Sequence, residues 1–433
     1  MGSSRVERLT GSAPLGAAAS LAPAIAFVGV LATTDADTTG AAFNRAAQMF
    51  VEGLLNGLST AGLAPNIVLG IEPIPAFPRS TRLVGRAGRF TTLGGRPVRL
   101  VPFLNVQPLK WLTAGIAVSI ALAGWAWRHR GRPRLVHCFN ISMPPGLFVW
   151  LAARLTGTKT LVSVNDVVTP GGIVPHTLFL KMDFALHRWL LPRFDGWMVV
   201  SHAIANDFLP GRPVCLIEGG VSPEFFEDVA PDPSAARERG RFRIVLAGSL
   251  ESFNGVELAL ESMSHLPDGY ELVVAGKGTI APAVEDAAAR DDRIVYRGLL
   301  EFDQLLELYR SADLLLNLRV TRAIDTRYFF PSKLMELLAS GTPVLSTCTG
   351  HVEEEYGGVL YLLREETAGA VAYRVLQIAG MPAKERHALG VKARAFMLTE
   401  KSWKKQGERL AEYIRTEMFP PALAVTQREA AHR

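Results

Sequence analysis

The chain has 433 residues, of which 48% are hydrophobic and 20% charged, and its formal net charge is +5 at pH 7. This length exceeds what one compact core usually holds, so two domains are expected, and the composition excludes a disordered chain. The small net charge, without a long Lys/Arg run, gives no indication of a nucleic-acid surface but leaves room for attraction to anionic lipid. Cys138, Cys215 and Cys348 form no CxxC pair, which predicts reduced thiols and a cytoplasmic location.

After a polar N-terminal stretch at 1–20, the first half of the chain alternates apolar runs with longer helical patterns. An irregular connection rich in Pro, Gly and Arg is expected at 72–108. Apolar strands separated by helices predict a parallel sheet covered on both faces, which we assign to a first domain at 21–212. The predicted strands are 24–31, 66–71, 134–139, 160–164 and 196–200, and the predicted helices are 41–61, 111–127, 145–156 and 177–191.

The segment 111–127 carries no charged side chain, although Lys110 precedes it and Arg128 follows it. Its length is at the lower end of the range for a membrane span. One interpretation is a helix buried against the sheet, which its place between two strands of one sheet favours. The other is a helix that docks the chain peripherally on the inner face of the cell membrane, which its terminal tryptophans suit.

The alternating pattern restarts after a loop rich in Pro, Asp and Arg, and it predicts a second doubly wound domain at 213–398. A helix at 402–418 lies in the remaining segment, 399–433. Two such domains predict a ligand cleft between them. The predicted strands are 242–246, 270–275, 292–296, 314–317, 342–345 and 358–361, and the predicted helices are 255–264, 280–290, 302–311, 332–340 and 365–380.

The stretch RYFFPSKLMELLASGTPVLST, 327–347, carries the strongest functional signal. A helix is predicted to begin at Ser332 and Lys333, with Glu336 one turn inside it. This arrangement offers backbone N–H groups and a cation to an anionic group, and a carboxylate to sugar hydroxyls. A ligand that carries a phosphate beside sugar hydroxyls is a nucleotide-sugar.

Two turns in the same half carry glycines. The stretch LVVAGKGTIAP contains a partial G-x-G-x-x-A at Gly276, which is a weak signal for a dinucleotide and also fits a tight turn at the rim of the cleft. The turn at Arg297 and Gly298 suits backbone contacts to a nucleobase.

The segment 313–347 resembles the donor site of retaining glycosyltransferases of family GT4, in the branch found in bacterial polysaccharide clusters. Shorter matches are VVSHAIANDF at 199–208 and VSPEFF after the glycine pair at 219–220. The resemblance implies a GT-B fold, in which two Rossmann-like domains face each other across a cleft and the last helix packs back on the first domain. It also implies that Glu336 binds the nucleotide ribose. Tyr328 stands where the family's E-x7-E motif has its first Glu.

GT4 enzymes commonly hold the donor diphosphate through an Arg and a Lys just after the first strand of the second domain. At that place this chain has Gly248, Ser249 and Asn254, so neither cation is present. A diphosphate still requires positive charge. We therefore assign stabilisation of the leaving group to Lys333 with Arg319, and donor contacts to Gly248 and Ser249. Arg322 and Arg327, on the loop that follows Arg319, are further possibilities for the cation.

In the first domain, GT4 enzymes often place a His near the reacting sugar, and His137 and Asp166 are the candidates for sugar or acceptor contacts. The alternative for His137 is a histidine buried in the core, and the alternative for Asp166 is a side chain that caps a loop.

The resemblance implies metal-independent transfer, with retention, from a nucleoside diphosphate sugar to a lipid-linked or polysaccharide-precursor glycan, without a cofactor. The sequence shows no metal-binding motif. Two alternatives stay open: a nucleotide-sugar epimerase of the same fold, and a non-catalytic nucleotide-sugar-binding protein.

Overall fold

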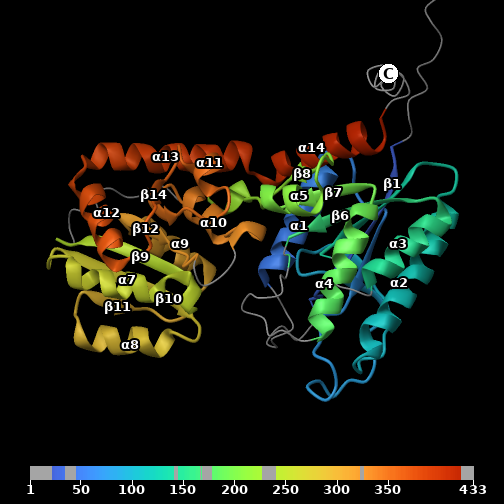
Figure 1. Ribbon diagram of the computed structural model, residues 1–433, viewed down its shortest axis with the longest axis horizontal. Coiled ribbons are helices and arrows are strands. Elements are labelled where there is room, and N and C mark those ends of the chain that lie inside the picture. The colour runs from blue at the N-terminus through green and yellow to red at the C-terminus, as the bar shows by residue number, and fades with distance from the viewer. Residues whose placement is uncertain are drawn as a thin grey trace, which may run out of the picture.

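The computed structural model of this chain describes residues 22–34, 45–140, 145–165, 167, 178–226, 240–321 and 326–420. Within these residues the chain forms two α/β units, each built around its own sheet (Figure 1). The first unit lies on the right of Figure 1 and the second on the left. The two doubly wound units expected from the sequence are confirmed.

The first unit contains an eight-stranded sheet in the order β3-β4-β2-β1-β5-β6-β7-β8, in which β3 pairs antiparallel with β4 and the other neighbours are parallel. The last strand lies beyond residue 212, so this sheet extends past the expected domain boundary. The strands are β1 (Ala24–Val30), β2 (Ile67–Ile71), β3 (Gly88–Thr91), β4 (Pro97–Leu100), β5 (Arg134–Phe139), β6 (Lys159–Val164), β7 (Gly196–Val199) and β8 (Cys215–Leu216). The helices are α1 (Arg45–Thr60), α2 (Leu109–Arg128), α3 (Pro145–Thr156), α4 (Leu178–Leu190) and α5 (His202–Phe208).

The second unit contains a six-stranded parallel sheet in the order β11-β10-β9-β12-β13-β14, which is the strand order of a dinucleotide-binding fold. The strands are β9 (Phe242–Ser249), β10 (Tyr270–Lys277), β11 (Ile294–Tyr296), β12 (Leu314–Asn317), β13 (Val344–Thr347) and β14 (Tyr361–Leu363). The helices between them are α7 (Val256–Ser262), α8 (Ala281–Arg290), α9 (Phe302–Arg310), α10 (Lys333–Ala339), α11 (Val352–Tyr356) and α12 (Ala368–Gly380).

The connection at 72–108, expected to be irregular, contains the strand pair β3 and β4. Charge pairs also order this segment. Buried Glu72 accepts hydrogen bonds from Arg82 Nη1 at 2.8 Å and from Arg86 Nε at 2.6 Å. Burial alone would raise the pKa of Glu72, but the two arginines lower it to about 2. An apolar pattern cannot reveal an element held in this way.

Helix α2 is buried on one face and exposed on the other. It is the one helix among the described residues that is long and apolar enough to cross a membrane. Val118 and Trp125 on one face belong to the core of the first unit, whereas Ile120 and Trp127 on the opposite face are 69% and 68% exposed. The helix therefore lies along the sheet and presents an apolar face to solvent.

The chain connects the two units twice. It passes into the second unit after β8, and it returns between α13 (Ala383–Glu400) and α14 (Trp403–Tyr413), drawn in red in Figure 1. Helix α14 packs on α1: the Trp403 ring meets Phe50 edge-to-face at 5.1 Å, and a Cβ on Gly407 would lie 2.0 Å from the carbonyl carbon of Gly57. The last helix of the chain thus lies against the first unit.

Candidate functional site

The carboxyl ends of the parallel strands meet at one edge of the second sheet, and the strand order reverses between β9 and β12. Ligands of such sheets bind in the crevice at this switch point. Gly248 and Ser249 end β9, Gly276 lies at the end of β10, and Arg319 follows β12. The structure therefore brings four of the residues expected at the site to one edge.

Gly276 marks a close approach between the ends of β9 and β10. Its φ is 138°, and a Cβ there would lie 1.8 Å from the carbonyl oxygen of Gly248. Its N–H donates to the carbonyl of Gly298, φ 63°, at 2.6 Å. Only glycine meets both conditions at position 276. The N–H of exposed Arg297 donates to the carbonyl of Val274 at 2.9 Å, so this backbone donor is occupied.

Arg319 reaches from β12 to the loop after β9. Its Nη1 donates to Asn254 Oδ1, and Asn254 Nδ2 donates to the carbonyl oxygen of Ser249 at 2.6 Å. Burial lowers the pKa of Arg319 from its ordinary value. Within the described part of the chain this guanidinium forms no ion pair. A cation that is withdrawn from water and has a neutral partner favours an anionic ligand.

A second charged group lies at the start of α10. Lys333 Nζ is 3.1 Å from Glu336 Oε2 and 5.6 Å from the centre of the Tyr309 ring. Burial alone would lower the pKa of Lys333, but Tyr309 and Glu336 raise it above its ordinary value, so Lys333 is a cation at neutral pH. Among the described residues no hydrogen bond or ion pair joins this group to Arg319. Lys333 and Arg319 are thus two separate cations.

The backbone at the start of α10 is partly engaged. The N–H of Leu334 donates to the carbonyl of Pro331 at 2.8 Å, and the N–H of Met335 donates to that of Ser332 at 3.2 Å. Two of the N–H groups that the sequence offered to an anion are therefore used. Ser332 is exposed and its side chain makes no capping hydrogen bond. Positive charge at this helix start comes mainly from Lys333.

The loop before α10 is attached to the first unit. Tyr328 is buried, and its hydroxyl donates to Asp207 Oδ2 at 2.7 Å. Its ring meets Phe208 of α5 edge-to-face at 5.4 Å, and Ser201 Oγ donates to the carbonyl of Arg327 at 2.7 Å. Tyr328 therefore holds the two units together at the place where the resemblance to GT4 enzymes leads one to expect a Glu.

His137 lies within β5 and is 1% exposed. Its Nε2 is 2.6 Å from Ser163 Oγ, and its ring meets Phe27 edge-to-face at 5.2 Å. Burial lowers the pKa of His137 to about 3, so the ring is neutral. This is the environment of a core histidine, the second of the two interpretations. Asp166 lies outside the described residues.

The sequence did not single out Asn140, which follows β5 at the carboxyl edge of the first sheet, where strand order reverses between β1 and β5. A hollow of about 30 Å³ lies there, lined in part by Gly29, Asn140 and Gly146. Asn140 has φ 44°, the one positive φ outside glycine among the described residues, and its Oδ1 accepts the N–H of Asn165 at 2.9 Å. A polar residue directly after an apolar strand is the sequence signal that could have identified Asn140.

Thr349, just past β13 in the second unit, was also missed. Its side-chain oxygen is buried and has no hydrogen-bond partner within the described residues. The next residue, Gly350, has φ 53°. A buried hydroxyl without a partner at the carboxyl edge is a further candidate for contact with a polar ligand.

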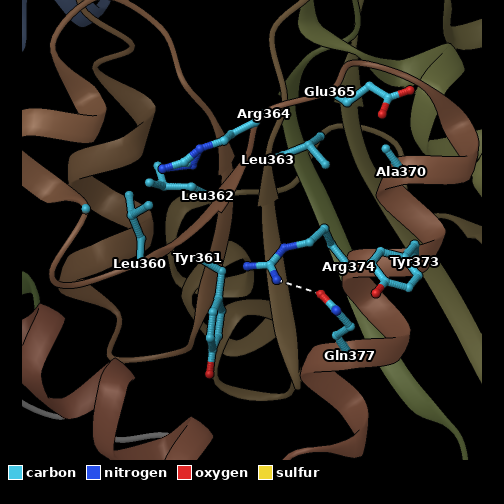
Figure 2. Close-up of a pocket in the computed structure, with 11 residues that line it drawn as sticks. Leu360, Tyr361, Leu362, Leu363, Arg364, Glu365, Ala370, Tyr373, Arg374 and Gln377 are labelled. Atoms are coloured by element: carbon cyan, nitrogen blue, oxygen red, sulfur yellow. Dashed lines mark hydrogen bonds between the residues drawn. The ribbon is translucent and has the colours of Figure 1, made fainter.

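A larger groove, of about 560 Å³, lies between β14 and α12 (Figure 2). In Figure 2, Tyr361 and Arg364 line one side and Arg374 and Gln377 the other, with Arg374 Nη1 donating to Gln377 Oε1 at 2.6 Å. Because β14 is the edge strand of the sheet, this groove is separate from the switch point between β9 and β12.

Two family models match the chain, and together they span more than two thirds of it. Residues 45–214 match the glycosyl transferase 4-like domain, and residues 241–380 match the glycosyl transferases group 1 domain. No curated protein matches the chain.

Solved structures with the same architecture include HepE of Anabaena in complex with UDP, with 14% identity, coverage of 90% of this chain and 99% of that chain, and a TM-score of 0.62. Sucrose-phosphate synthase of Thermosynechococcus elongatus has 16% identity, coverage of 91% and 98%, and a TM-score of 0.62. A glycosyltransferase of Rickettsia africae has 14% identity, coverage of 92% and 98%, and a TM-score of 0.63. These identities show the fold, and the family models add the enzyme class. The chain is therefore a glycosyltransferase with the GT-B fold, composed of a glycosyl transferase 4-like domain followed by a group 1 glycosyl transferase domain.

Proposed function

We propose that this glycosyltransferase, of the GT4 polysaccharide type, transfers a sugar from a nucleoside diphosphate donor to a hydroxyl of a lipid-linked or polysaccharide-precursor glycan. In this proposal the anomeric configuration is retained and no metal or cofactor takes part. The observation that carries it is Arg319, a half-buried cation with a neutral partner at the switch point of the second sheet. HepE, which is similar in fold, was crystallised with UDP and with UDP-glucose, and this supports a nucleotide-sugar donor.

The leaving diphosphate carries the developing negative charge, so fixed cations lower the barrier most. We assign this role to Arg319 and Lys333. When Lys333 turns to the phosphate, Glu336 loses its present partner and becomes available to the ribose hydroxyls. The turn at Arg297 and Gly298 contacts the nucleobase in this proposal.

The acceptor binds at the carboxyl edge of the first sheet, beside Asn140, in this proposal. Asp166, one residue after Asn165, is the proposed polar contact for sugar or acceptor. His137 supports the sheet behind this edge and touches no substrate. The three free cysteines agree with a reducing compartment, and we place the enzyme in the cytoplasm.

A thermal-shift panel of UDP-, GDP- and ADP-sugars tests the donor assignment. One base class should raise the melting temperature of the wild type, because binding to the folded state adds about 2.7 kcal/mol at a hundredfold excess over Kd. Arg319→Ala should lose this shift, and Arg319→Lys should keep part of it as a point charge. Arg290→Ala, at the exposed end of α8, is the control. A panel without any shift contradicts the proposal, and an unchanged shift in Arg319→Ala places the diphosphate elsewhere.

Lys333→Ala should lower turnover at least ~100-fold, about 2.7 kcal/mol of barrier, because a cation at the leaving group is lost. The measurement is release of nucleoside diphosphate from the donor that the panel identifies. Lys384→Ala, exposed at the start of α13, should leave the rate unchanged. A rate like that of the wild type in Lys333→Ala would remove this lysine from the mechanism.

A further inference from the structure

The outer face of the first unit carries an apolar stripe along α2. Its members are spaced by three, four or seven residues, so they lie on one face of the helix. They are between 39% and 69% exposed: Leu109, Leu112, Ile116, Ile120 and Trp127. Helices α2 and α3 lie on the side of the first unit remote from the second (Figure 1), and α3 adds Leu151 and Leu155, 40% and 87% exposed.

The loops before α2 continue this apolar surface. Phe77 pairs with Val106 and Val84 pairs with Leu104 through isolated backbone bridges, and all four side chains are exposed. The N–H of Leu104 donates to Thr113 Oγ1 of α2 at 3.0 Å, which fixes this loop beside the helix. The exposed apolar residues thus form one surface, which we call the α2 face. Contiguous exposed surfaces of this kind mark interaction sites.

The same part of the chain is strongly basic. Residues 73–165 contain thirteen Lys or Arg and no Asp or Glu, whereas the net charge of the whole chain is only +5. Basic charge is therefore concentrated on the segment that carries the α2 face.

Several of these arginines lie at the carboxyl ends of α2 and α3. Arg134 donates to carbonyl oxygens of both ends, which keeps them together. Arg128 and Arg154 are exposed there, and the Arg130 guanidinium lies 4.8 Å from the centre of the Trp127 ring. A tryptophan beside an arginine suits the level of lipid headgroups, where one part of the pair is apolar and the other is hydrated.

We infer that the α2 face docks on the surface of an anionic lipid bilayer. Helix α2 lies flat on this surface, because its opposite face, with Val118 and Trp125, is fixed in the core. An apolar stripe with a basic border is the pattern of an interfacial helix. Charge decides between occupants: a second copy of the chain would bring two basic surfaces together, whereas anionic headgroups complement them. The inference goes beyond the proposed transfer reaction and does not depend on the donor.

Co-sedimentation of the full-length protein with vesicles tests this inference. The wild type should bind vesicles of phosphatidylglycerol and phosphatidylcholine, and bind pure phosphatidylcholine much more weakly. The double variant Ile116→Glu, Ile120→Glu should bind at least ~10-fold more weakly, because it removes apolar contact and adds negative charge. Arg128→Ser and Arg130→Ser should each lower partitioning about fivefold at low salt. Leu299→Glu, 66% exposed on the second unit, is the matched control and should bind like the wild type.

Three outcomes would overturn the inference: no binding of the wild type to anionic vesicles, equal binding to pure phosphatidylcholine, or equal binding of the double variant. Light scattering gives a fourth outcome that would overturn it. If the wild type is a dimer that the double variant dissociates, the α2 face is occupied by a second copy. The thermal shift with the nucleotide-sugar should persist in the double variant, which shows that it is folded. This readout also separates failure of the docking surface from failure of the proposed donor site.

Discussion

Replacing Lys401 with Met is expected to lower the free energy of unfolding by about 3–5 kcal/mol, because it leaves a buried carboxylate with one partner fewer. Lys401 lies between α13 and α14, where the chain returns to the first unit. Its Nζ is 2.8 Å from Glu218 Oε2, and His351 Nε2 lies 2.8 Å from the other carboxylate oxygen. The side chains of Glu218 and Lys401 are 0% and 1% exposed. The pair of Glu218 and Lys401 therefore links the connection after β8 to the connection between α13 and α14.

The measurement is the shift of the first urea unfolding transition. Lys405→Met is the matched control, since Lys405 is 44% exposed and lies 3.8 Å from Glu408, and such surface pairs contribute about 0–1 kcal/mol. Adding Glu218→Gln to Lys401→Met should restore part of the loss, because the unpaired charge is then gone. If Lys401→Met lowers the free energy of unfolding no more than Lys405→Met, the pair of Glu218 and Lys401 does not hold the two connections together.

Acid titration of the same variants gives an independent check. Burial alone would raise the pKa of Glu218, but the hydrogen bond from His351 and the charge and hydrogen bond of Lys401 lower it to about 2. A lowered pKa stabilises the fold above the ordinary value of 4.5, and this contribution is lost as the pH falls from 4.5 towards 2. Glu218 should account for about 3 kcal/mol of the stability that the wild type loses across this window. The loss should be smaller in Lys401→Met.

The regular elements of both sheets could be predicted because apolar strands and amphipathic helices alternate along most of the chain. Elements without that pattern were missed. Helix α13 buries only Gly390, Ala393 and Met397 through most of its length, so it lacks an apolar stripe. Strands β3 and β4 are short and rich in Arg, Gly and Pro, and the ion pairs of Glu72 that order this segment join residues 10 and 14 positions apart, beyond the span of a helical or strand repeat. The local periodicity of the sequence gives no information about such contacts.

The candidate site was likewise predicted only in part. Spacing placed Arg319 at the end of a buried strand, and parallel topology then brought it to the edge with Ser249. The sequence presented Asn254 only as a lost cation, whereas in the structure it joins Arg319 to the loop after β9. Tyr328 likewise appeared only as a lost Glu. Its partner Asp207 lies 121 residues away, a distance over which one sequence gives no pairing information.

Replacing Gly276 with Ala is expected to lower turnover more than ~1,000-fold, about 4 kcal/mol, and to remove the thermal shift with the donor. The added Cβ would meet the carbonyl oxygen of Gly248 at 1.8 Å, and the φ of 138° adds strain for any L side chain. Because the obstacle is backbone, the end of β9 must move. That movement displaces Ser249 and, through Asn254, the guanidinium of Arg319.

Two further glycines separate the causes of this loss. Gly269→Ala, at the turn before β10, meets no atom within 4 Å and has no positive φ, so it should behave like the wild type. Gly248→Ala combines φ 145° with open space, so it tests backbone strain without a clash and should give an intermediate loss. If Gly276→Ala and Gly248→Ala lower turnover equally, backbone strain alone explains the loss. If Gly276→Ala binds donor like Gly269→Ala, the ends of β9 and β10 do not form the diphosphate site.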